Sequence, residues 1–251
     1  MSVDARSLPM PEPASEAPAS LATLDLFALG RQASAARDAR LGRRGTFVRA
    51  RQLLATGGWR GPRDAAESII DEADLSTILS TIGGLPAVRA AGVELLVAGA
   101  DSPQARAAAE AGLRVLLRVP YRLGEDDGER LDRLAAIEQA AFDVWGVMPS
   151  PVGESYGLDT LRFFALCRLA LPRVPHLLAD VGALGPRLAQ MAFGFGADEL
   201  FAPIVAERAL RLGANAHNPA LTRKEAATLI RGAGLGPCER FSDGTIEEVT
   251  A

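Results

Sequence analysis

Short apolar runs alternate with amphipathic segments along most of the chain, which predicts alternating strands and helices. The apolar runs lie near residues 46, 93, 113, 142 and 174, and each is predicted to be a strand. Segments whose apolar residues recur every three or four positions predict helices at residues 102–111, 126–141, 158–171 and 186–193. This alternation predicts an α/β fold, an incomplete (β/α) TIM-like barrel with about five parallel strands. Because a closed barrel of this type has eight strand–helix units, the chain looks three units short.

Two further features of the pattern affect how such a sheet could be completed. Pro62 opens a segment in which Ile69, Ile70 and Leu75 share one face, and this spacing predicts a helix. A sheet of five strands cannot close and would leave two exposed edges. Since proteins cover or pair bare edges, the pattern predicts a partner, either a second copy or another protein.

The chain divides into three predicted regions. Residues 1–22 are rich in Pro, Ala, Ser and Glu and are predicted to be a disordered tail, because they cannot bury enough apolar surface. Residues 23–212 form the partial barrel, and residues 213–251 form a helical extension with a polar tail. Thr222 and Glu225 have the spacing of a capping box at the start of the last helix.

Charge and composition exclude several classes of protein. The 27 Lys and Arg residues against 31 Asp and Glu residues give a net charge of −4, which argues against a nucleic-acid-binding surface. No apolar run is long enough to span a membrane and no targeting segment is visible, so we expect a cytoplasmic protein. Two cysteines and two histidines cannot form an iron–sulfur cage or a multi-histidine site, so no metal is expected.

Several short motifs occur together and in order in the second half of the chain. They are Arg168-Leu169, Pro175-His176, Leu184-Gly185-Pro186, Phe195-Gly196-Ala197-Asp198 and Ala220-Leu221-Thr222-Arg223. With these motifs the chain resembles the radical S-adenosylmethionine (SAM) enzymes of menaquinone and deazaflavin biosynthesis. This family comprises aminofutalosine synthase, cyclic dehypoxanthine futalosine synthase and the deazaflavin-forming synthases. The last of the motifs is most similar to aminofutalosine synthase.

The chain departs from this family where its chemistry resides. In the family, a Cys-x3-Cys-x2-Cys loop after the first strand holds a [4Fe–4S] cluster that binds SAM. Here Trp59 stands at the first cysteine position, and the next cysteine is Cys167. Between Trp59 and the strand at Val93 there is room for about one strand–helix unit, so further units look deleted. We therefore expect no cluster, no SAM-dependent radical and no other cofactor.

Six residues are the best candidates for a site, because the resemblance or their position after a predicted strand singles them out. They are Glu125 and Tyr121 as catalytic candidates, and Arg118, Glu154, His176 and Asp180 as ligand-binding candidates. Two of them have simpler interpretations: Glu125 begins an acidic run that suits a helix N-terminus, and His176 can be structural. The stretch ending at Glu154 has lost a histidine that the family carries, which leaves substrate recognition open.

Two functional hypotheses follow. The first is a cluster-less, non-catalytic partner or regulatory subunit linked to the futalosine route to menaquinone. It would pair with itself or with a full-length radical SAM enzyme. The alternative is an enzyme of a different reaction class that binds a nucleoside or an aryl carboxylate. That enzyme would use Glu125 and Tyr121 for acid–base chemistry.

Overall fold

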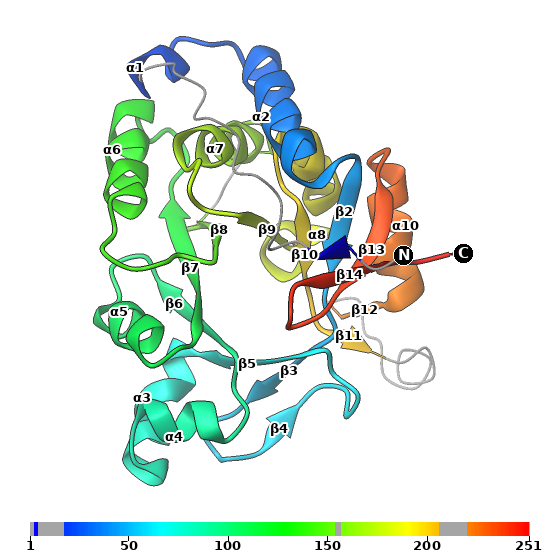
Figure 1. Ribbon diagram of the computed structural model, residues 1–251. Coiled ribbons are helices and arrows are strands. Elements are labelled where there is room, and N and C mark those ends of the chain that lie inside the picture. Colours follow the sequence, from blue (N-terminus) through cyan, green and yellow to red (C-terminus); the bar gives the residue numbers. More distant parts are fainter. Residues whose placement is uncertain (1–2, 5–17, 154–156, 206–219, 251) are drawn as a thin grey trace.

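The computed structural model describes residues 3–4, 18–153, 157–205 and 220–250 (Figure 1). The strands are β1 (Val3–Asp4), β2 (Arg44–Phe47), β3 (Ala50–Leu53), β4 (Trp59–Arg60), β5 (Glu67–Asp71), β6 (Leu95–Gly99), β7 (Arg114–Tyr121), β8 (Gly146–Pro151), β9 (His176–Asp180), β10 (Glu199–Phe201), β11 (Ile204–Val205), β12 (Leu221–Thr222), β13 (Gly236–Arg240) and β14 (Thr245–Glu248). The helices are α1 (Pro18–Leu21), α2 (Leu26–Leu41), α3 (Glu72–Ile82), α4 (Leu85–Ala90), α5 (Pro103–Glu110), α6 (Asp127–Glu138), α7 (Gly157–Ala170), α8 (Val181–Ala192) and α10 (Arg223–Gly232), with a 3-10 turn η2 (Phe193–Phe195).

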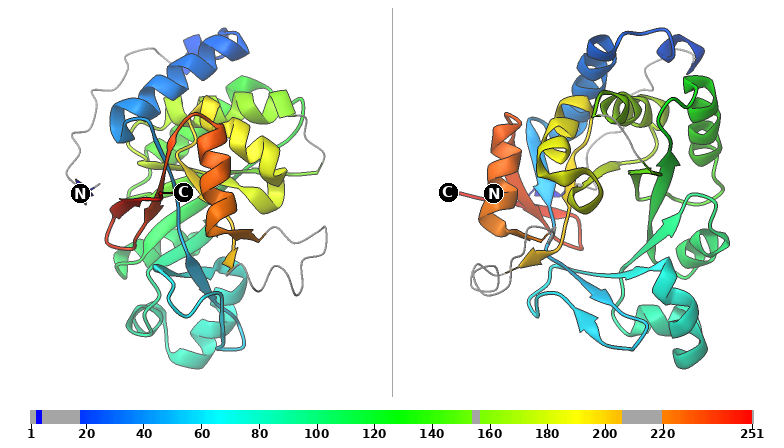
Figure 2. Two further views of the ribbon diagram at one scale, coloured as in Figure 1. Left: turned by 90° about the vertical axis from the view of Figure 1, so that its right-hand side faces the viewer. Right: turned by 180° about the vertical axis from the view of Figure 1, so that it is seen from behind.

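One curled, mostly parallel sheet forms the centre of the molecule. The strands from β13 through β2, β10, β9, β8, β7, β6 and β5 to β3 pair in parallel, each with the next. Helices lie along the outside of the curl (Figure 2). This arrangement confirms the predicted α/β fold, an incomplete TIM-like barrel.

The sheet is more complete than the apolar runs predicted. Strands β2 and β3 follow one another in the chain, yet β2 pairs with β10 whereas β3 pairs with β5. Within the described residues the curl from β2 to β3 therefore has seven strand positions, counting β2 and β3 as one, where a closed barrel has eight. Strand β13 is added to this curl by its pairing with β2. The helix predicted around Ile69 and Ile70 is wrong, because these residues lie in β5. Strand β10 was not predicted at all.

Short antiparallel strands extend both ends of the parallel sheet. Strand β4 pairs with the outer side of β3, with Leu53 opposite Trp59. At the other end, β14 covers β13, and the short β1 covers β14. The edges of the sheet are therefore the two-residue strands β4 and β1, and a partner for these edges stays a prediction.

Two apolar layers hold the sheet. The larger layer lies between the sheet and the outer helices, and includes Leu96 and Leu117. The smaller layer fills the inside of the curl and consists of Ile69, Leu95, Val97, Leu116, Met148 and Leu178. Because successive side chains of a strand point to opposite faces, these inner residues define which other positions point inward.

The C-terminal part of the chain joins this architecture. Thr222 caps α10 and forms the predicted capping box with Glu225. Strands β13 and β14 then add to the main sheet. The predicted boundary at residue 213 lies outside the described residues. No helix in the described ranges is both long and apolar enough to cross a membrane.

Candidate functional site at the carboxyl end of the sheet

Three charged residues point into the curl at the carboxyl ends of their strands. Asp71 on β5, Arg118 on β7 and Asp180 on β9 each follow an inner apolar residue by two positions, so they share its face. In parallel barrels this end of the strands carries the chemistry. We call these three residues the carboxyl-end cluster.

The carboxyl-end cluster is held by ion pairing and by helix capping. The Arg118 guanidinium donates to Asp71 at 2.6 Å. Asp71 and Asp180 are also the N-cap residues of α3 and α8, where each accepts a backbone N–H two residues later in the chain. Burial raises the pKa of Asp180, although two backbone N–H groups and the charge of Arg118 oppose the rise. The cluster therefore carries a carboxylate whose charged form is disfavoured.

Tyr121, a predicted catalytic residue, lies on the opposite face of β7. It is buried against α7, where its hydroxyl is 2.8 Å from the Thr160 hydroxyl and its ring packs on Phe163 at 4.8 Å. The structure thus places Tyr121 in the helix-facing core and apart from the inner face that carries Arg118.

Glu125, the other predicted catalytic residue, is engaged in ion pairs. It contacts Arg133 and lies 3.5 Å from Arg130. Burial raises the pKa of Glu125, but the hydrogen bond from Arg133 and the neighbouring charges outweigh it, so the pKa lies below its usual range. The helix N-cap is the next residue, Asp126. This geometry agrees with a structural role at the start of α6.

Of the ligand-binding candidates, the structure brings Arg118 and Asp180 to one end of the sheet and His176 to the other. His176 begins β9, where its Nδ1 is 3.1 Å from Asp198 and its ring packs on Trp145 at 4.5 Å. Glu154 lies outside the described residues.

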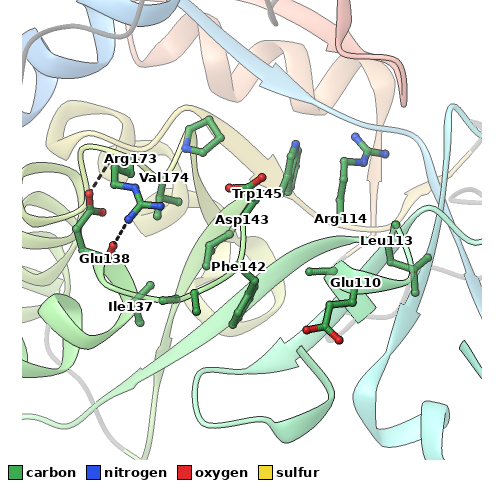
Figure 3. A pocket seen from close by; sticks show the side chains of 16 residues that line it. Glu110, Leu113, Arg114, Ile137, Glu138, Phe142, Asp143, Trp145, Arg173 and Val174 are labelled. Atoms are coloured by element: carbon green, nitrogen blue, oxygen red, sulfur yellow. Dashed lines mark hydrogen bonds between the residues drawn. The ribbon is translucent and has the colours of Figure 1, made fainter. Parts of the chain in front are cut away.

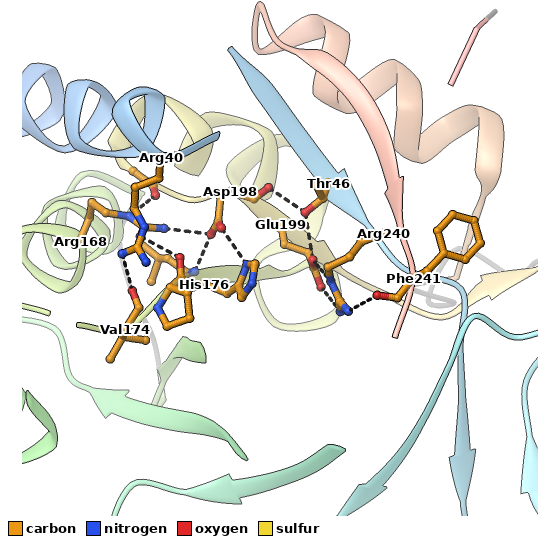
Figure 4. A network of polar contacts seen from close by, with 12 residues as sticks. Arg40, Thr46, Arg168, Val174, His176, Asp198, Glu199, Arg240 and Phe241 are labelled. Carbon is orange, nitrogen blue, oxygen red and sulfur yellow. Dashed lines mark hydrogen bonds and ion pairs between the residues drawn. The ribbon is translucent and has the colours of Figure 1, made fainter. Parts of the chain in front are cut away.

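A buried network that the sequence did not predict closes the amino end of the curl. Arg240 on β13 donates to Glu199 at 2.6 Å (Figure 4). It also donates to Glu67 at 3.0 Å, and all three side chains are at most 2% exposed. Arg114 also contacts Glu67, and Thr46 donates to Glu199 at 2.9 Å. We call Glu67, Arg114, Glu199 and Arg240 the amino-end network.

Two acids at this end, Glu67 and Asp198, are held in their charged form. Burial raises the pKa of Glu67, but the charges of Arg240 and Arg114 outweigh it and the pKa lies below its usual range. The pKa of Asp198, beside this network, is likewise lowered, because Arg168 at 2.9 Å and His176 outweigh the effect of burial. Sequence spacing could have found part of this network, since Glu67 and Arg114 lie two positions before inner apolar residues.

Known proteins resemble parts of this chain in sequence. No family model matches the chain. Aminodeoxyfutalosine synthase of Thermus thermophilus is 28% identical over 152 residues, which cover 54% of this chain and 41% of that protein. A 5-amino-6-(D-ribitylamino)uracil–L-tyrosine 4-hydroxyphenyl transferase of Methanosarcina barkeri is also 28% identical, over 52% of this chain and 40% of that protein. The chain spans about two fifths of the length of these curated relatives.

Solved structures agree on the fold. Methylornithine synthase (PylB) superimposes with a TM-score of 0.60 and 12% identity, covering 88% of this chain and 92% of that one. The [FeFe]-hydrogenase maturase HydG gives a TM-score of 0.58 and 11% identity, covering 88% of this chain and 71% of that one. Part of the chain is therefore similar in sequence to aminodeoxyfutalosine synthase, and the chain shares its fold with methylornithine synthase and HydG.

The two cysteines of the chain do not fit a [4Fe–4S] cluster. Cys167 lies in α7 and Cys238 on β13, both are buried, and burial raises the pKa of both thiols, whereas a cluster needs several thiolates together. After β3 the chain forms a hairpin in which the Arg51 guanidinium lies 4.2 Å from the centre of the Trp59 ring. Among the described residues, no three His, Cys, Asp or Glu side chains are grouped to hold a metal.

Proposed function

We propose that this chain works without an iron–sulfur cluster, as a non-catalytic partner or regulatory protein of a full-length radical SAM enzyme. One observation carries the proposal: the sheet and its buried network are present, while the hairpin of β3 and β4 has no thiol. Thiolate ligation is what gives the cluster its cage, and without the cluster SAM cannot be cleaved to a radical.

The similarity to aminodeoxyfutalosine synthase supports a link to the futalosine route to menaquinone. Because the matched stretch is only about two fifths of that enzyme, the link concerns the pathway and not the reaction. A second copy of this chain is the alternative companion. We place the protein in the cytoplasm, with its companion.

Anaerobic reconstitution with iron and sulfide tests the cluster-less part of the proposal. We expect the purified chain to retain no stoichiometric iron and no visible cluster absorption. The paired variants Cys167→Ala and Cys238→Ala serve as controls, and we expect them to behave like the parent. About four irons per chain that disappear in either variant would contradict the proposal.

Affinity purification from the host tests the partner. The tagged chain is purified anaerobically, and its companions are identified by mass spectrometry with iron analysis of each fraction. We expect a stoichiometric radical SAM enzyme, with the iron following the companion and not the tagged chain. A chain that emerges alone or only with its own copies, free of iron, overturns this partnership.

The carboxyl-end cluster favours a second candidate function, an enzyme of a non-radical class that binds a nucleoside or an aryl carboxylate. The supporting observation is the raised pKa of Asp180 beside Arg118, since perturbed acids gather at catalytic sites. We base this hypothesis on Arg118 and Asp180, because Tyr121 is buried against α7 and Glu125 is ion-paired; a catalytic role for those two residues stays a prediction. A thermal shift with nucleosides that disappears in Arg118→Gln would support it, and no shift in the parent protein would contradict it.

A further inference from the structure

A cavity of about 630 Å³ lies at the amino end of the sheet, opposite the carboxyl-end cluster. The segments that precede β7, β8 and β9 form its rim, together with the last turns of α5 and α6 (Figure 3). Its volume falls in the range of small-molecule sites, roughly 300–1,000 Å³. Catalytic sites of barrels lie at the other end, so neither the fold nor the proposed function accounts for this cavity.

The walls of the cavity suit a flat, apolar body. Phe142 and Trp145 supply two aromatic side chains, and most of the remaining wall is aliphatic: Ala109, Leu113, Ile137, Ala140, Val144 and Val174. Trp145 is held before any ligand arrives, because the Arg240 guanidinium lies 4.6 Å from its ring centre and the His176 ring lies at 4.5 Å. A pre-positioned aromatic wall lowers the entropic cost of binding a planar ring.

Arg114 gives one end of the cavity a cation. Its side chain is 20% exposed, and it lines the cavity beside Trp145. The hydrogen bond to Glu67 uses only Nη2 of the five donors of a guanidinium. Burial lowers the pKa of Arg114, so an anion at this position would stabilise its charged form.

Three acids line the cavity: Glu110, Glu138 and Asp143. Glu110 pairs with Arg106 at 3.0 Å on the surface of α5. Glu138 lies at the end of the cavity opposite Arg114, where its Oε1 accepts from the backbone N–H of Arg173 (Figure 3). Its Oε2 is buried without a hydrogen-bond partner among the described residues, and burial raises the pKa of Glu138, which disfavours its charged form. Asp143 is exposed, so solvent and salt screen its charge. Among the residues that line the cavity, Arg114 is the cation that a buried partner, Glu67, holds in place, and its guanidinium lies 5.4 Å from the centre of the Trp145 ring.

We propose that this amino-end cavity binds a planar aromatic anion, with its ring against Phe142 and Trp145 and its charge on Arg114. The site is separate from the carboxyl-end cluster and does not depend on the partner proposed above. Arg114 and Arg118 point to the same inner face of β7 at opposite ends, which supplies a matched pair of variants.

Fluorescence of Trp145 tests the site directly. In a Trp59→Phe background Trp145 is the sole tryptophan, since the chain has two. The probe is 4-nitrobenzoate, which quenches indole emission on contact. Its neutral isostere 4-nitrobenzamide and the cation 4-nitrobenzylamine are the comparisons. We expect saturable quenching by the anion. Each comparison probe should bind at least about tenfold more weakly than 4-nitrobenzoate, because only the carboxylate can accept a charge-assisted hydrogen bond from Arg114, and such hydrogen bonds are stronger than neutral ones.

Three variants locate the binding. Arg114→Gln should weaken 4-nitrobenzoate binding about tenfold, while Arg118→Gln should leave it within about twofold. Glu67 keeps its contact with Arg240 in the first variant, so the fold has a remaining buried pair. Ala141→Phe, which fills the cavity from an exposed position on its wall and leaves Arg114 intact, should also reduce binding.

Three results would overturn the proposal. They are equal or tighter binding of the neutral or cationic probe, loss of binding in Arg118→Gln but not in Arg114→Gln, and quenching that never saturates. The second of these would move the ligand to the carboxyl-end cluster and so favour the non-radical enzyme. The first would assign the cavity to a different class of ligand.

Discussion

The two ends of the curled sheet are built from one pattern and differ in how their charges are satisfied. On three strands a polar residue, an apolar residue and a second polar residue point inward in turn: Glu67-Ile69-Asp71 on β5, Arg114-Leu116-Arg118 on β7 and His176-Leu178-Asp180 on β9. At the amino end Glu67 and Arg114 belong to the amino-end network with Glu199 and Arg240, and His176 contacts Asp198 beside it. At the carboxyl end Arg118 pairs with Asp71, and both side chains are partly exposed.

Acids at the two ends have pKa shifts of opposite direction, whereas burial lowers the pKa of Arg114 at the amino end and so disfavours its charge. The pKa values of Glu67 and Asp198 are lowered, so the fold favours their charged forms. The pKa of Asp180 is raised by burial, so the fold disfavours its charge. Groups that a fold holds against their preference are typical of functional sites, whereas fully paired buried groups stabilise the fold. From this comparison of the two ends we infer that the amino-end network stabilises the fold and that the carboxyl-end cluster is a binding site. The amino-end cavity lies beside the network and shares Arg114 with it.

The largest expected effect comes from Arg240→Met. This change leaves the carboxylates of Glu67 and Glu199 buried, with fewer cations to balance them. We expect a loss of about 3–5 kcal/mol in the free energy of unfolding, measured by urea denaturation at pH 7. The matched change Arg118→Met, at the partly exposed carboxyl end, should cost about 1 kcal/mol or less.

A triple variant separates charge imbalance from lost packing. Adding Glu67→Gln and Glu199→Gln to Arg240→Met removes the unpaired charges, and we expect it to recover part of the lost stability. If Arg240→Met and Arg118→Met cost the same, the contrast between the two ends fails.

Asp198→Asn should have the next largest effect and should be visible in the pH dependence. Because the folded pKa of Asp198 is lowered, its stabilising contribution is present above its usual pKa of about 3.9 and is lost as the pH falls through the folded value. We expect a loss of about 3 kcal/mol at pH 7 and a shallower fall in stability below about pH 4. Urea denaturation at a series of pH values measures both. An unchanged acid dependence would show that Asp198 is not held charged.

Sequence reasoning reached the fold class and missed much of the network, for identifiable reasons. The apolar runs at β6, β7 and β9 were long enough to identify as strands. Ile69 and Ile70 fit a helix as well as a strand, because a short apolar run has no decisive period. Strand β10 has three residues, which is too short for a periodic signal.

The candidate site was partly predictable for the same kind of reason. Arg118 and Asp180 follow clear strands, so their end of the sheet could be deduced. The face of Tyr121 could not be deduced until the inner residues of β7 were known. The contact between Arg240 and Glu67 joins residues 173 positions apart and depends on a strand order that spacing does not reveal.

Asp180→Asn has the smallest expected effect, yet it tests the contrast between the two ends of the sheet most sharply. Its expected change in the free energy of unfolding differs in sign from that of Asp198→Asn. Burial raises the folded pKa of Asp180, so its charge at neutral pH opposes folding, and stability falls as the pH rises from the unfolded to the folded pKa. Asparagine removes that charge and still caps α8, since Asn is as good an N-cap as Asp. We expect the free energy of unfolding at pH 7 to rise or to stay within about 0.5 kcal/mol of the parent value. If Asp180→Asn instead loses as much stability as Asp198→Asn, then Asp180 is a structural group, and the carboxyl-end cluster loses its claim to be a binding site.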